Sequence, residues 1–146
     1  MRRERENLSG LDYLLGAGVF GAALLSRLLF LFSSNDARWP HSAWFQGDAT
    51  LWAEWAGLLV KGEEFERGLA VHAPAVAYVL RWMGYGAGPQ DFTGAKVVWC
   101  AVSAAACGLT FLAARMELSR RVALIASVIL AFAFESYLMA TSLNGE

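Results

Sequence analysis

Apolar runs alternate with polar segments along this chain, and three of the runs reach or approach the length of a bilayer crossing. They cover residues 11–32, 93–114 and 122–140. A transmembrane helix needs about 20 mostly apolar residues to cross the hydrocarbon core. The hydropathy pattern therefore predicts an all-α integral membrane protein with about three transmembrane helices.

The segment between the first two runs, residues 33–92, carries helical patterns of its own. Over residues 48–61 an apolar stripe with two tryptophans faces away from Glu54 and Lys61, and Gly62 is a plausible C-cap. A second short helix is predicted from Pro74 to about residue 83, because proline favours the first helical position. Both helices are too short to cross a bilayer.

Tryptophan is concentrated in this loop, where five of the six tryptophans lie between residues 39 and 82. Tryptophan side chains prefer the interface between a membrane and water. We therefore expect the two short helices of the loop to be amphipathic juxtamembrane helices that lie on the bilayer surface, with a re-entrant segment as the alternative for the second.

Charge placement predicts the orientation of the chain. Arginines cluster before the first apolar run and again at residues 115–121, between the second and third runs. Cytoplasmic loops of membrane proteins carry such an excess of arginine and lysine, so the N-terminus is expected in the cytoplasm. The loop at 33–92 then lies outside, and its excess of acidic side chains argues against nucleic acid as a partner.

Two charges fall inside the apolar runs, Arg27 in the first and Glu135 in the third, at similar distances from the outer side. A charge within a membrane is costly unless it is paired. Three interpretations remain open: the two charges pair with each other, Arg27 faces the phosphate of a lipid-linked substrate, or Arg27 reaches to the interface. Cys100 and Cys107 are interpreted as packing residues, and the small residues at 103–108 should let a neighbouring helix approach closely.

Asp48 directly precedes the first of the two short helices and has two interpretations. An aspartate at this place is a good N-cap, and a carboxylate on the outer side can also act as a general base. His72 precedes the second short helix. It is interpreted either as a ligand-binding residue or as a surface residue. The sequence has no cluster of cysteine and histidine that would supply a metal site.

The order of these segments resembles a known family. A first transmembrane helix is followed by Gly47-Asp48-Ala49-Thr50-Leu51-Trp52, then by His72-Ala73-Pro74 and by Trp82-Met83-Gly84. This order is similar to the N-terminal part of the polyprenyl-phosphate-dependent glycosyltransferases of the GT-C fold, in the branch of the protein O-mannosyltransferases and the lipid A aminoarabinose transferase. The chain departs from the pattern at Ala49, where a glutamate is usual, and at Ala73, where a proline is usual.

The resemblance implies that a sugar is transferred, with inversion, from a polyprenyl-phosphate donor to an acceptor hydroxyl on the outer face of the membrane. It implies Asp48 as the catalytic base and places His72, Arg27 and Glu146 near the substrate. The resemblance is compatible with a divalent metal. It also points to location in a bacterial inner membrane. Such enzymes use many more helices, so further helices are expected downstream or in a partner chain, and the 146 residues would form an N-terminal part.

Two alternatives belong to other classes of protein. The chain could be a small three-helix membrane scaffold that binds partners through the small-residue face at 103–108 without catalysis. It could also be part of a transporter, in which Arg27 and Glu135 would handle an ion or substrate.

Overall fold

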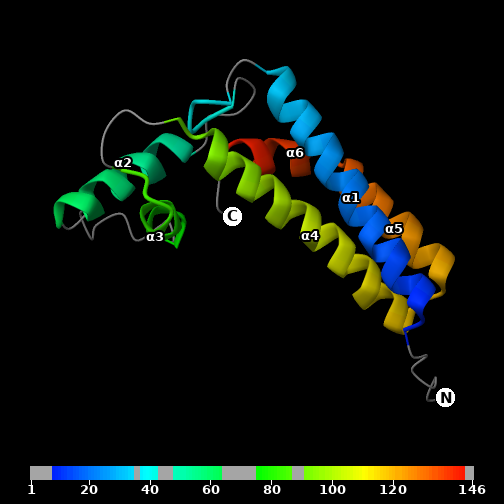
Figure 1. Ribbon diagram of the computed structural model, residues 1–146. Helices are drawn as coiled ribbons and strands as arrows, with labels where there is room; N and C mark the ends of the chain where they lie inside the picture. The colour runs from blue at the N-terminus through cyan, green and yellow to red at the C-terminus, as the bar shows by residue number, and fades with distance from the viewer. Residues whose placement is uncertain (1–7, 35–36, 43–47, 64–74, 87–90, 144–146) are drawn as a thin grey trace.

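The computed structural model describes residues 8–34, 37–42, 48–63, 75–86 and 91–143, and every regular element in these ranges is an α-helix (Figure 1). The prediction of an all-helical chain is confirmed for them. The helices are α1 (Gly10–Ser33), α2 (Ala49–Lys61), α3 (Ala75–Trp82), α4 (Thr93–Glu117), α5 (Arg120–Phe132) and α6 (Phe134–Thr141).

Two of these helices, α1 and α4, are each long and apolar enough to cross a membrane. The pair α5 and α6 would form a third span if it is taken as one crossing, but its two helices meet at an angle of 52°. The sequence predicted one continuous helix over 122–140, and the structure differs from this at Ala133, whose backbone is extended. These helices agree with a membrane protein that has two or three crossings.

The helices α1, α4 and α5 form an elongated bundle, and α6 bends across it near the end of α1 (Figure 1). The helices α1 and α4 pack closely at Gly108, where an added methyl group would lie 3.0 Å from the carbonyl oxygen of Gly16. Ala104 and Cys107 are buried in the same contact. The predicted small-residue face of α4 is thus used within the chain, to bring α1 close.

An ionic cluster joins the three helices at the end of the bundle where the N-terminus lies. The buried carboxylate of Asp12 accepts hydrogen bonds from Nε of Arg115, at 3.2 Å, and from Nε of Arg120, at 2.7 Å. Asp12 and Ser9 also form a reciprocal capping box at the start of α1. Asp12 therefore takes part in the cap at the start of α1 and also connects α1 to α4 and α5.

Beyond the other end of the bundle, α2 and α3 pack against each other beside the beginning of α4 (Figure 1). We call residues 37–42, 48–63 and 75–86 the loop unit. The apolar core of the loop unit includes Trp52 and Trp55 of α2 and Leu80 of α3, and it also takes in Leu143, which follows α6. The predicted helix over 48–61 is confirmed, including its C-cap at Gly62 with a φ of 76°.

Candidate functional site

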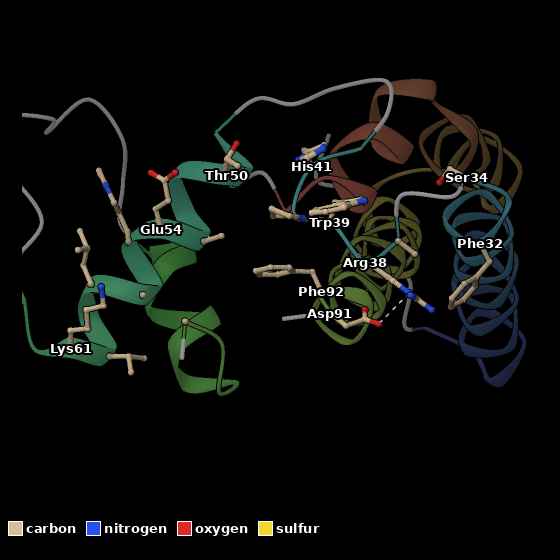
Figure 2. Close-up of a pocket in the computed structure, with 18 residues that line it drawn as sticks. Phe32, Ser34, Arg38, Trp39, His41, Thr50, Glu54, Lys61, Asp91 and Phe92 are labelled. Carbon is tan, nitrogen blue, oxygen red and sulfur yellow. Dashed lines mark ion pairs between the residues drawn. The ribbon is translucent and has the colours of Figure 1, made fainter. Parts of the chain in front are cut away.

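An open groove with a volume of about 1760 Å³ lies between α2 and the turn at residues 37–42 (Figure 2). The end of α1 and the residues just before α4 complete its walls. This volume exceeds the roughly 300–1,000 Å³ of sites for small ligands, so the groove has room for a large or extended molecule. Its lining residues are Phe32, Ser34, Ala37, Arg38, Trp39, Pro40, His41, Thr50, Ala53, Glu54, Trp55, Gly57, Leu58, Val60, Lys61, Gly86, Asp91 and Phe92.

One wall of the groove is the polar face of α2. Thr50, Glu54 and Lys61 are exposed and line it, because the helical period places them opposite the buried Trp52. Figure 2 shows these three side chains along α2, across the groove from Trp39. The wall therefore presents both a carboxylate and an ammonium group to any occupant.

Gly86, in the loop after α3, packs its backbone directly against α2 and so supports this wall of the groove. An added Cβ at Gly86 would lie 2.5 Å from the carbonyl oxygen of Ala56. Gly86 also has a φ of 108°, a conformation that residues with a side chain rarely adopt. The close packing of the loop after α3 on α2 therefore requires glycine at this position.

The opposite wall is the turn at residues 37–42, which is attached to the beginning of α4. The backbone N–H of Phe92 donates to the carbonyl of Arg38 at 3.0 Å. The ammonium group of Lys96, which is fully buried, donates to the carbonyl of His41 at 2.8 Å. An ion pair of 3.7 Å joins Arg38 to Asp91 at the groove surface (Figure 2). These three contacts define the position of the wall.

Aromatic rings lie beside the charges of this wall. Trp39 is 60% exposed and stacks on His41 at a centroid distance of 6.2 Å. Phe92 stacks on Tyr85, whose hydroxyl accepts a hydrogen bond from the backbone N–H of Ala95. Exposed aromatic faces next to charged side chains suit an occupant that has both apolar and polar surfaces.

The carboxyl group of Asp91 has a pKa below its ordinary range. The main cause is a hydrogen bond from the Thr93 side chain, followed by one from the Thr93 backbone N–H at 2.9 Å, and the nearby charge of Arg38 adds to the effect. Asp91 is therefore ionised at neutral pH, which maintains its ion pair with Arg38.

Asp48 lies directly before α2 and is half-buried. Its backbone carbonyl accepts a hydrogen bond from the N–H of Trp52 at 2.9 Å, but its side chain makes no capping bond to the helix. The residue occupies the N-cap position without the side-chain bond on which the capping interpretation depends. Asp48 is not among the lining residues, although Thr50 is.

Arg27 is fully buried within the bundle and does not line the groove. Its guanidinium donates to Ser103 Oγ, to the carbonyls of Ala23 and Ala131, and to Cys107 Sγ. Glu135 is exposed, so the predicted pair between Arg27 and Glu135 is wrong. The alternative in which Arg27 extends to the interface also fails, because its side chain is fully buried and donates to acceptors within the bundle, in α1, α4 and α5.

The remaining predicted site residues, His72 and Glu146, lie outside the described residues, and their roles stay predictions. Within the described ranges, no three histidine, cysteine, aspartate or glutamate side chains are grouped as metal ligands. Cys100 and Cys107 are both buried and unbridged, as expected for packing residues.

Sequence reasoning missed the burial of Asp12 and Lys96. Both have a visible signal, because each lies within four residues of the start of a predicted membrane span. Intramembrane charges of this kind are unusual and commonly have a partner. The groove itself had no such signal, because its walls come from segments far apart in the sequence.

Comparisons with protein-family models, curated proteins and solved structures found no match to this chain.

Proposed function

We propose that the chain is the N-terminal part of a membrane glycosyltransferase with a GT-C fold, which transfers a sugar from a polyprenyl-phosphate donor to an acceptor hydroxyl. The observation that carries the proposal is the groove, whose charged and aromatic walls adjoin the ends of two apolar helices long enough to cross a membrane. A lipid-linked donor can keep its tail in the bilayer there while its polar head reaches those walls.

The proposed topology has three crossings, α1, α4 and the bent pair α5–α6, with the N-terminus in the cytoplasm of a bacterial cell. The arginines near the start of α5 support this orientation. The helices α2 and α3 would then be amphipathic helices on the outer surface. The exposure of Trp39 and Trp82, at 60% and 86%, suits this location, because tryptophan prefers the interface.

The chemistry assigned to Asp48 is general base catalysis. Its carboxylate takes the proton of the acceptor hydroxyl as the oxygen attacks the anomeric carbon of the sugar. The bond between that carbon and the donor phosphate breaks, and the phosphate leaves with the electron pair. Attack opposite to the leaving group inverts the anomeric centre.

Two features of the groove fit this role. Asp48 is the N-cap residue directly before α2, the helix that forms one wall. Thr50, two residues further on, lines the groove. Arg38 and Lys61 bring positive charge to the two walls, where they can stabilise a phosphate leaving group. His72 and Glu146 remain proposed to act near the substrate. Arg27 is fully buried in the bundle and does not line the groove, so its proposed role is indirect, through the helices that it joins.

The scaffold alternative depends on the small-residue face of α4. Ala104, Cys107 and Gly108 of that face are buried, and Gly108 packs directly on α1. This use of the face within the chain favours the enzyme over the scaffold.

The proposal is tested by expressing the full coding region and profiling the lipid-linked sugars of the membranes by mass spectrometry. Expression should deplete one polyprenyl-phosphate sugar, and Asp48→Asn should abolish the depletion at an equal protein level. Glu63→Gln is the matched control, because Glu63 is an exposed carboxylate just beyond the other end of α2 and outside the groove lining. Undiminished depletion with Asp48→Asn would refute the base assignment.

A further inference from the structure

The bend between α5 and α6 has no cause in its own sequence. The two helices meet at 52°, with Ala133 between them. Sharp bends in helices come from proline, from glycine or serine pairs, from π-bulges, or from a side chain that inserts into the hydrogen-bond ladder. Residues 120–141 contain neither proline nor glycine, and their two serines, Ser127 and Ser136, are too far apart to form a pair.

A side chain from another helix does insert into this ladder. Nη1 of Arg27, in α1, donates to the carbonyl of Ala131 at 3.0 Å. In an uninterrupted helix that carbonyl would accept from the backbone N–H four residues later, which belongs to Glu135. The arginine thus occupies the acceptor that a straight α5–α6 helix would need.

The same guanidinium contacts both sides of the break. On the α5 side it binds the Ala131 carbonyl, and on the α6 side it lies over the ring of Tyr137, 5.3 Å from the centroid. Nε donates to Ser103 in α4 at 3.0 Å, and Nη1 also donates to Ala23 in α1 at 3.1 Å. Arg27 therefore connects α1, α4, α5 and α6.

The energetic reason is the buried positive charge. Arginine does not lose its proton in a protein, and none of the partners that Arg27 has among the described residues is a carboxylate. A buried charge without hydrogen-bond partners is far more costly than one backbone bond. Ending α5 near Ala131 gives the guanidinium a carbonyl at the negative end of a helix dipole.

We propose that Arg27 is a positioning residue that imposes the bend on the third span and so directs α6 toward the loop unit. Beyond the bend, Ala140 packs with Leu31 and Cys100, and Leu143 joins the core formed by α2 and α3. The bend thereby connects the membrane bundle to the unit that forms the groove. This inference is independent of the proposed glycosyl transfer.

The test uses the full chain in aligned bilayers, with nitrogen-15 labels in α5 and α6. Solid-state NMR then gives the tilt of each helix, and hydrogen exchange reports the backbone N–H of Glu135. Arg27→Met should reduce the angle between the helices to below about 20°, the limit above which a bend counts as a kink. The Glu135 N–H should gain the Ala131 carbonyl as its acceptor and exchange about tenfold more slowly.

Two further variants keep the test decisive. Arg27→Gln is polar but two atoms shorter than arginine, so it should lose the bend in the same way even if Arg27→Met does not fold. Ser103→Ala removes a partner of Arg27 but leaves the bond to Ala131, so it should keep the bend. A bend that persists in either folded Arg27 variant, with unchanged exchange at Glu135, would overturn the proposal.

Discussion

Asp12 of α1 and Arg120 of α5 form a hydrogen-bonded ion pair of 2.7 Å at the N-terminal end of the bundle, although they are 108 residues apart in the chain. The carboxylate is fully buried, whereas the Arg120 side chain is 40% exposed. Arg115 shares the same oxygen at 3.2 Å. One carboxylate therefore pairs with two cations, and its removal affects both.

The first prediction concerns this cluster. Asp12→Asn should lower the midpoint of thermal unfolding in detergent by about 5–10 °C, because it removes the buried carboxylate that contacts both arginines. Ser9→Ala is the matched control, since it removes a hydroxyl that bonds to Asp12 and accepts from Arg120 but removes no charge. Its midpoint should fall by only about 2–4 °C. Equal shifts for the two variants would show that the ion pairs contribute nothing beyond the cap.

The contact of α1 with α4 gives a second prediction. Gly108→Ala places a methyl group 3.0 Å from the Gly16 carbonyl and 3.2 Å from Cβ of Phe20. This overpacking should reduce the free energy of unfolding by about 1–3 kcal/mol, as measured by titration with a denaturing detergent. Gly18→Ala should leave it unchanged or slightly higher, because an added Cβ there meets nothing within 4 Å. Equal stability of the two variants would contradict the close helix contact.

The loop after α3 offers a third prediction, which compares two glycines of positive φ. Gly84 has a φ of 89°, and an added Cβ there meets nothing within 4 Å. Gly84→Ala should therefore cost only the backbone strain, about 1 kcal/mol. Gly86→Ala adds a clash with the carbonyl of Ala56, so the backbone amides of α2 should exchange hydrogen much faster than in the Gly84 variant. Similar exchange in both variants would mean that the loop does not support this wall of the groove.

A fourth prediction concerns pH. The pKa of Asp91 is lowered in the folded protein, so its contribution to the wall at 37–42 is present above the unfolded pKa of about 3.9 and is lost as the pH falls through the lowered folded value. Exchange of the Phe92 N–H, which donates to Arg38, should therefore accelerate below about pH 4, relative to the intrinsic rate. Asp91→Asn should show fast exchange already at pH 6, with no acid transition. An acid transition retained in that variant would assign it to another group.

Local features of the sequence predicted much of the fold. The spans α1 and α4 follow from their long apolar runs, and α2 follows from a stripe with the helical period that ends at Gly62. Such signals lie within one segment, so no knowledge of distant contacts is needed. Asp48 was likewise placed correctly at the start of α2.

Other features depend on residues far apart in the chain. The bend at Ala133 arises where Arg27 takes a carbonyl 104 residues away, and nothing near Ala133 in the sequence signals it. The groove has the same origin, because its second wall is held by Lys96, which binds the His41 carbonyl 55 residues away. Hydrophobic periodicity does not report such contacts.

Photo-crosslinking tests whether the groove binds the head of a polyprenyl-phosphate sugar, as proposed above. A benzophenone amino acid replaces Trp39, which lines the groove, or Trp82, which is exposed but lies outside the groove lining. After irradiation of intact membranes, mass spectrometry identifies the lipid attached at each site. We expect a polyprenyl-phosphate sugar at position 39 and ordinary phospholipid at position 82. Phospholipid alone at both positions would contradict it.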